Sequence, residues 1–138
     1  MDPFSALGAA ATIGALAGLA KDVVCNMYRY YEAVRDAPKR AQELRQEMGI
    51  MCELLDILEQ VANGPEFKAS GRLFATISVA IVAFKETLEE MSKLTSAANV
   101  KGTKRLKWPF SNEKNDKMLE KMQTYKTSFT LALQLKAE

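Results

Sequence analysis

Histidine is absent from this chain of 138 residues, which removes the side chain that most often serves as general base or metal ligand. The sequence also has no glycine-rich phosphate loop and no nucleophile elbow. No pair of carboxylates stands apart from the acidic residues of helix surfaces. We therefore expect no enzymatic activity, no metal and no cofactor.

Cysteine is scarce as well, with only Cys25 and Cys52, each inside a helix-like pattern and without the spacing of metal ligands. They need not be paired, which suits a reducing compartment such as the cytoplasm. A net charge of +2 is too small to argue for nucleic acid by itself. The length predicts a single domain over residues 1–138, and 48% apolar residues is ordinary for a soluble globular protein.

Charge is missing from the run Pro3 to Ala20, which is built mostly from alanine and glycine. A helix over this run reaches about 27 Å, just short of the roughly 30 Å hydrocarbon core of a bilayer. A segment poised between water and lipid suits a conditional membrane inserter. The large apolar residues that we expect to contact lipid are Phe4, Leu7, Ile13, Leu16 and Leu19.

Small residues recur at every fourth position of the run, at Ala10, Gly14 and Gly18. On a helix they form a smooth stripe against which another backbone can pack closely, as membrane helices do. Two other interpretations stay open. The run could be a buried N-terminal helix of a bundle, or a secretory signal peptide, although no Lys or Arg precedes it.

The apolar spacing along the chain predicts four helices, over residues 3–35, 38–62, 70–94 and 111–135. Breaks follow Asp36, Asn63 and Thr95, where proline or glycine interrupts the pattern. The third helix contains many β-branched residues, but its three-four spacing favours helix over strand. The predicted fold class is all-α, an antiparallel bundle of four main helices with a long apolar N-terminal helix.

The break before the last helix is basic and aromatic, because its cations lie beside Trp108 and Phe110 without an acidic residue. An anionic membrane surface attracts such cations, and so do nucleic-acid phosphates. A solvated loop is the third interpretation. We expect no nucleic-acid partner, because no further basic face adjoins the break. The candidate residues for anionic lipid are Lys101, Lys104, Arg105 and Lys107.

The two ends of the chain carry a family resemblance. Residues 1–8, Met-Asp-Pro-Phe-Ser-Ala-Leu-Gly, resemble the opening of fungal HeLo-like N-terminal domains, and so do residues 107–110, Lys-Trp-Pro-Phe, with the segment 118–134. Such domains precede the NACHT modules of STAND (NLR-type) receptors, or lipase-like effectors. The resemblance spans nearly the whole chain, and it implies a domain excised from a longer receptor or effector.

The resemblance also implies a function in programmed cell death and heterokaryon incompatibility, a form of fungal innate immunity. In that family picture a glycine-zipper-like N-terminal helix drives homo-oligomerisation and membrane attack, and the zipper maps here to Ala10, Gly14 and Gly18. The domain would relocate from the cytoplasm to anionic lipids of the plasma membrane when a downstream NACHT or effector domain clusters it. The alternative is a non-lytic protein-interaction or autoinhibitory module at the N-terminus of a STAND receptor.

Overall fold

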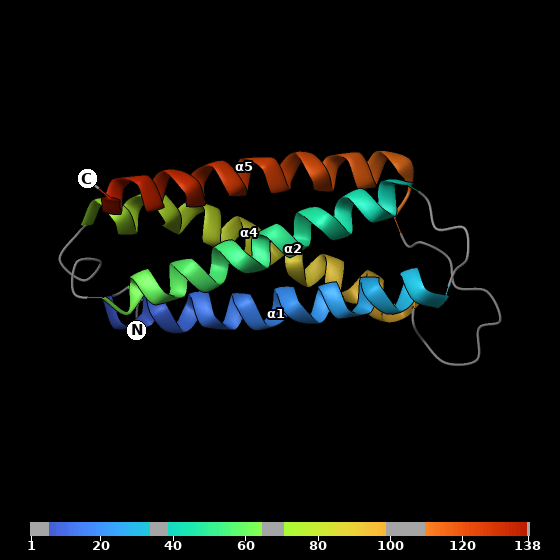
Figure 1. The fold of residues 1–138 in the computed structure, drawn as a ribbon, viewed down its shortest axis with the longest axis horizontal. Coiled ribbons are helices and arrows are strands. Elements are labelled where there is room, and N and C mark those ends of the chain that lie inside the picture. The colour runs from blue at the N-terminus through green and yellow to red at the C-terminus, as the bar shows by residue number, and fades with distance from the viewer. Residues whose placement is uncertain (1–5, 34–38, 65–70, 99–109, 138) are drawn as a thin grey trace.

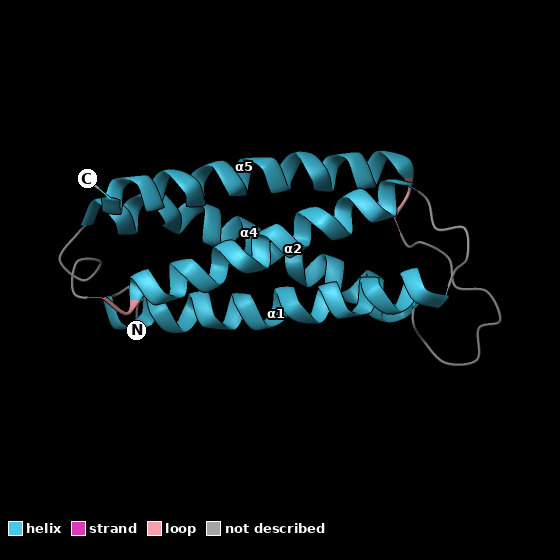
Figure 2. Cartoon of the chain, viewed as in Figure 1, coloured by secondary structure: helices cyan, strands magenta, loops and turns pink. Residues whose placement is uncertain are grey.

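The computed structural model describes residues 6–33, 39–64, 71–98 and 110–137, which are almost entirely helical (Figure 1). Helix α1 covers Ala6–Ala33, α2 covers Lys39–Ala62, α4 covers Gly71–Ala98 and α5 covers Asn112–Ala137. These described ranges contain no strand (Figure 2), so the predicted all-helical class is confirmed for them.

Two helix ends lie where the sequence predicts them. Helix α2 ends at Ala62, and the backbone N–H of Asn63 donates to the Glu59 carbonyl at 3.1 Å. Helix α5 begins after Ser111, whose Oγ accepts a hydrogen bond of 3.1 Å from the backbone N–H of Lys114. A serine in this position satisfies one of the amide donors that a helix leaves unpaired at its start.

The β-branched stretch of α4 is helical, as its apolar spacing predicts. Ile77, Ile81 and Phe84 are all buried on the same face of the helix. The Phe84 ring lies 5.0 Å from that of Tyr125 and 6.0 Å from that of Phe129, measured between centroids. Burial against α5 therefore outweighs the lower helix propensity of the branched residues.

Consecutive helices in each half of the chain run antiparallel. Lys21 of α1 pairs with Asp56 of α2, with 3.3 Å between Nζ and Oδ1. Farther along α1, the ring of Tyr28 lies under the guanidinium of Arg45, which is earlier in α2. Helices α4 and α5 run antiparallel in the same way (Figure 1). The predicted antiparallel arrangement describes these two pairs.

The other two neighbouring pairs run parallel. Arg40 of α2 pairs with Asp116 of α5, and Glu47 pairs with Lys126, so the residue numbers rise together. Helices α1 and α4 also run in one direction where they pack side by side (Figure 1). Helices α2 and α4 lie diagonally opposite each other, because each packs mainly against α1 and α5. Helical periodicity carries no information on this order, so the sequence could not have predicted it.

A single apolar core joins all four helices. Helix α1 is part of it and turns one face inward along most of its length. Its buried members of the core cluster are Ile13, Leu16, Ala17, Ala20, Val23 and Met27.

Helix α1 lies within the predicted range 3–35 but does not have the predicted apolar character. From Lys21 onward it carries charged residues, and its first half consists largely of alanine and glycine, which are only weakly hydrophobic. Within the described part of the chain, no helix combines the length and the hydropathy that crossing a membrane requires.

Candidate functional site

The large apolar residues predicted to contact lipid do not form a free face in this structure. Ile13 is completely buried and Leu16 is 2% exposed, because both pack into the core between the helices. Leu19 is half-buried against the same core. Phe4 and the side chain of Leu7 lie outside the described residues. In this arrangement Ile13 and Leu16 stabilise the bundle, so contact with lipid would require α1 to leave it.

The predicted small-residue stripe is divided between two environments. Ala10 is half-buried and packs against the core. Gly14 faces α2, where an added Cβ would meet the carboxylate of Glu59, whose Cδ lies 3.3 Å away. Gly18 is exposed, and nothing lies within 4 Å of the position of its missing Cβ. The stripe therefore begins as a contact inside the bundle and ends on its surface.

The outer face of α1 is uncharged over the first half of the helix. Ala11, Ala15 and Gly18 are exposed, and no charged residue occurs in α1 before Lys21. A surface helix normally turns charged side chains to water, whereas a helix without charge on any side is typical of a buried environment. The first half of α1 thus has the composition of a buried helix with one side in water.

A shallow groove of about 320 Å³ lies along this outer face, between α1 and α4. Its floor is mostly apolar, and Lys85 of α4 stands at its edge. The α1 residues that line it are Ala11, Thr12, Ala15, Leu16 and Leu19.

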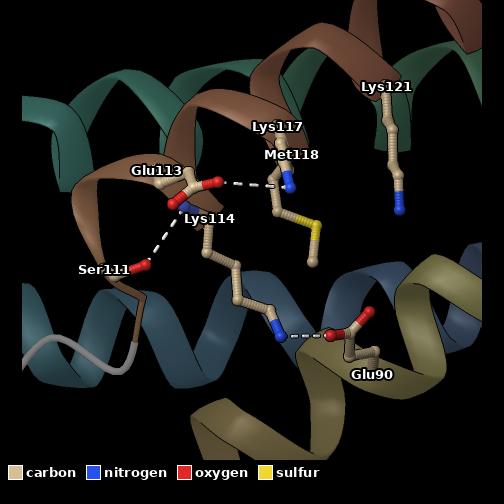
Figure 3. Close-up of a pocket in the computed structure, with 7 residues that line it drawn as sticks. All are labelled: Glu90, Ser111, Glu113, Lys114, Lys117, Met118 and Lys121. Atoms are coloured by element: carbon tan, nitrogen blue, oxygen red, sulfur yellow. Dashed lines mark hydrogen bonds and ion pairs between the residues drawn. The ribbon is translucent and has the colours of Figure 1, made fainter.

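The cations predicted to bind lipid headgroups, Lys101, Lys104, Arg105 and Lys107, lie outside the described residues. The start of α5 carries a second group of cations, which the sequence analysis missed. Three lysines of α5 line a pocket there together with Glu90 of α4 (Figure 3). The three-four spacing of Lys114, Lys117 and Lys121 was the signal that could have identified them.

Two of these lysines are engaged in ion pairs. Lys114 pairs with Glu90 across the α4–α5 boundary, and Lys117 pairs with Glu113 at 3.4 Å within α5 (Figure 3). The hydrogen bond from Lys114 holds the pKa of Glu90 below its ordinary value. The pocket is therefore a lysine-rich surface partly neutralised by its own acidic neighbours.

Metal-binding chemistry has no support among the described residues, since no group of acidic and cysteine side chains there could hold an ion. Comparison with protein-family models, curated proteins and solved structures finds no match to this chain. The resemblance to HeLo-like domains accordingly stays a prediction.

Proposed function

We propose that this chain is a membrane-targeting domain that executes programmed cell death or incompatibility when several copies are brought together. The observation that carries the proposal is the uncharged outer face of α1, formed by Ala11, Ala15 and Gly18. A helix whose first half has no charge on either side is suited to a second environment, in which neighbouring helices or lipid surround it.

In the closed bundle the inner face of α1 is held by the core. Exposing Ile13 and Leu16 to water would cost roughly 3 to 6 kcal/mol together. A single copy therefore keeps α1 in place. Clustering raises the effective concentration of neighbouring copies, and lipid takes up the released apolar side chains, so both offset this cost.

The roles of individual segments in this proposal are taken from the sequence analysis. The Gly/Ala-rich N-terminal helix engages lipid through Phe4, Leu7 and the apolar residues that release exposes. The cations of segment 101–107 hold anionic headgroups at the plasma membrane. A downstream NACHT or effector domain, in the same chain or in a partner, supplies the clustering that recruits the domain from the cytoplasm.

The test is dye release from vesicles of anionic phospholipid, with the domain fused to a module that dimerises on addition of a small molecule. We expect release only after clustering. Ala15→Glu places a charge on the outer face of α1, where the fold has room for it because Ala15 is exposed. A charge near the bilayer centre costs about 2.5–3.5 kcal/mol, so release should fall more than tenfold at an unchanged melting temperature.

Val79→Glu is the matched control, since Val79 of α4 is 77% exposed and does not line the groove between α1 and α4. This variant should release dye as the unaltered domain does. Equal release by the Ala15→Glu and unaltered domains would contradict the proposed role of α1.

The alternative function, a non-lytic interaction or autoinhibitory module, is favoured by two observations. Ile13 and Leu16 are integral to the core, and Val79 and Val82 form an exposed apolar patch on α4. A module of this kind would never release dye. Its partner binding would be weakened by Val79→Glu and left intact by Ala15→Glu, so the same two variants separate the two functions.

A further inference from the structure

The two cysteines of the chain lie on the same seam between α1 and α2. The ion pair between Lys21 and Asp56 fixes the antiparallel register of these helices. Cys25 follows Lys21 by one helical turn, and Cys52 precedes Asp56 by one helical turn. On antiparallel helices these two steps lead to the same level, so Cys25 and Cys52 lie at one level of the boundary between α1 and α2, one turn from the ion pair.

Both thiols are free, and their surroundings differ. Cys25 is exposed, whereas Cys52 is half-buried against the core. Burial raises the pKa of the Cys52 thiol to about 11, and the nearby carboxylate of Asp56 contributes to the rise. Cys25 adds a smaller contribution of the same sign to this pKa, in keeping with the shared level of the two residues on the helices.

We propose that Cys25 and Cys52 are a thiol modification site, at which a peroxide drives formation of a reversible disulfide that fastens α1 to α2. A disulfide needs Cα atoms about 4.4–6.8 Å apart, a spacing that facing positions on packed helices can provide. The exposed Cys25 is the thiol that an oxidant in solution meets first.

The chemistry balances with hydrogen peroxide as the oxidant. The Cys25 thiolate attacks one peroxide oxygen, the O–O bond breaks, and water leaves after proton transfer, which forms a sulfenic acid. The Cys52 sulfur then attacks the Cys25 sulfur, the S–O bond breaks, and a second water leaves. Two thiols have lost two electrons and two protons to one peroxide. A thiol such as dithiothreitol reverses the bond by exchange.

The consequence for activity rests on the proposed function. The disulfide would tie the second half of α1 to the middle of α2, so the whole of α1 could not separate from α2. Oxidation would then hold the domain in its closed state, with α1 in the bundle. Reduction of the disulfide would allow α1 to leave the bundle. Formation of the bond itself depends only on the geometry of the two helices.

The first test treats the full chain with hydrogen peroxide and maps disulfides by mass spectrometry without reduction. We expect one linkage within a single chain, joining the peptides that carry Cys25 and Cys52, and its loss on reduction. Closing the loop between them should raise the melting temperature by roughly 5 to 10 °C. Neither Cys25→Ser nor Cys52→Ser should show this rise.

The control variant combines Cys25→Ser with Asp22→Cys. It keeps an exposed cysteine on the same helix but turns it away from the seam, because Asp22 is exposed and lies off the register of Cys52. We expect almost no linkage within the chain. Equal linkage in the control, or linkage only between separate chains of the unaltered protein, would overturn the proposal.

The second test compares dye release by clustered protein in the reduced and oxidised forms. Dye release by the reduced form alone supports the proposal that the disulfide holds α1 in the bundle. Equal dye release by both forms overturns this effect on activity, even though the disulfide forms. An intramolecular disulfide with no release from either form contradicts the proposed function and leaves the disulfide site established.

Discussion

At the scale of single residues, Gly14 and Gly18 are equivalent in the sequence and different in the structure. Both lie on the small-residue stripe that the sequence predicts, four positions apart. The side chain of Glu59 lies against Gly14, whereas Gly18 faces open space. The pattern of small residues was readable from the sequence, but the neighbour of each glycine depends on the register of α1 against α2.

This difference predicts that alanine substitutions at the two positions change the stability of the bundle by different amounts. Gly18→Ala should stabilise the bundle by about 0.5–1 kcal/mol, because alanine restricts the unfolded chain and fits the free space. Gly14→Ala should gain less, since the Glu59 carboxylate must move aside. Urea denaturation of both variants measures the difference, and an equal gain at both sites would refute the assigned packing.

The free space at Gly18 also allows a test of close contact between the α1 helices of neighbouring copies. Leucine at position 14 would overpack the seam with α2 and cost about 1–3 kcal/mol. Leucine at position 18 has room, so Gly18→Leu should keep the fold and block close contact between copies of α1. Clustered protein with this change should lose dye release although its melting temperature is no lower than that of the unaltered domain. Undiminished release would remove Gly18 from the mechanism.

At the scale of helices, the sequence predicted what periodicity encodes and missed what depends on neighbours. The four helices, the end of α2 at Ala62 and the cap at Ser111 follow from local spacing and capping chemistry. The parallel pairing of α2 with α5 does not, because amphipathic faces specify burial but not a partner. For the same reason the sequence left open whether Ile13 and Leu16 contact lipid or lie inside a bundle, and in this structure they pack into the core.

The contact between α4 and α5 predicts a dependence of stability on pH. The pKa of Glu90 is lowered from its ordinary value of 4.5, chiefly by the hydrogen bond from Lys114. A carboxyl whose pKa is depressed by folding stabilises the native state above its unfolded pKa. That contribution is lost as the pH falls through the folded value.

Glu90→Gln should therefore lower stability near neutral pH, and the difference should vanish as the pH falls below the depressed pKa of Glu90 in the folded protein. The effect should be small, because both side chains of the pair are partly exposed. Melting temperatures of the two proteins across this range provide the measurement. A difference that persists unchanged in acid would mean that the pair does not act through ionisation.

At the scale of the whole molecule, the helices differ in how much apolar packing holds them in the bundle. Among the described side chains of the first half of α1, the large ones that reach the core are Ile13, Leu16 and the half-buried Leu19, and the others are mostly alanines. Helix α4 instead packs the buried Phe84 against two aromatic rings of α5, those of Tyr125 and Phe129. Local opening should follow this contrast, since segments with fewer apolar contacts open at lower free energy.

Hydrogen exchange followed by mass spectrometry should show this order. Amides of residues 10–20 should exchange about tenfold or more faster than those of 80–90, without global unfolding. Oxidation at Cys25 and Cys52 should slow the exchange in α1. Protection of α1 equal to that of α4 in the reduced protein would argue against a helix poised to leave.

The direction of the helices has a consequence for how the domain could be joined to others. Helix α1 begins at the same end of the bundle at which α5 ends (Figure 1). Segments joined before α1 and after α5 would therefore meet the bundle at this one end. Bulk attached beyond α5 would stand next to the start of α1 and shield it sterically. A rearrangement of that attached body would then uncover the tip of α1 directly, without any signal passing through the core.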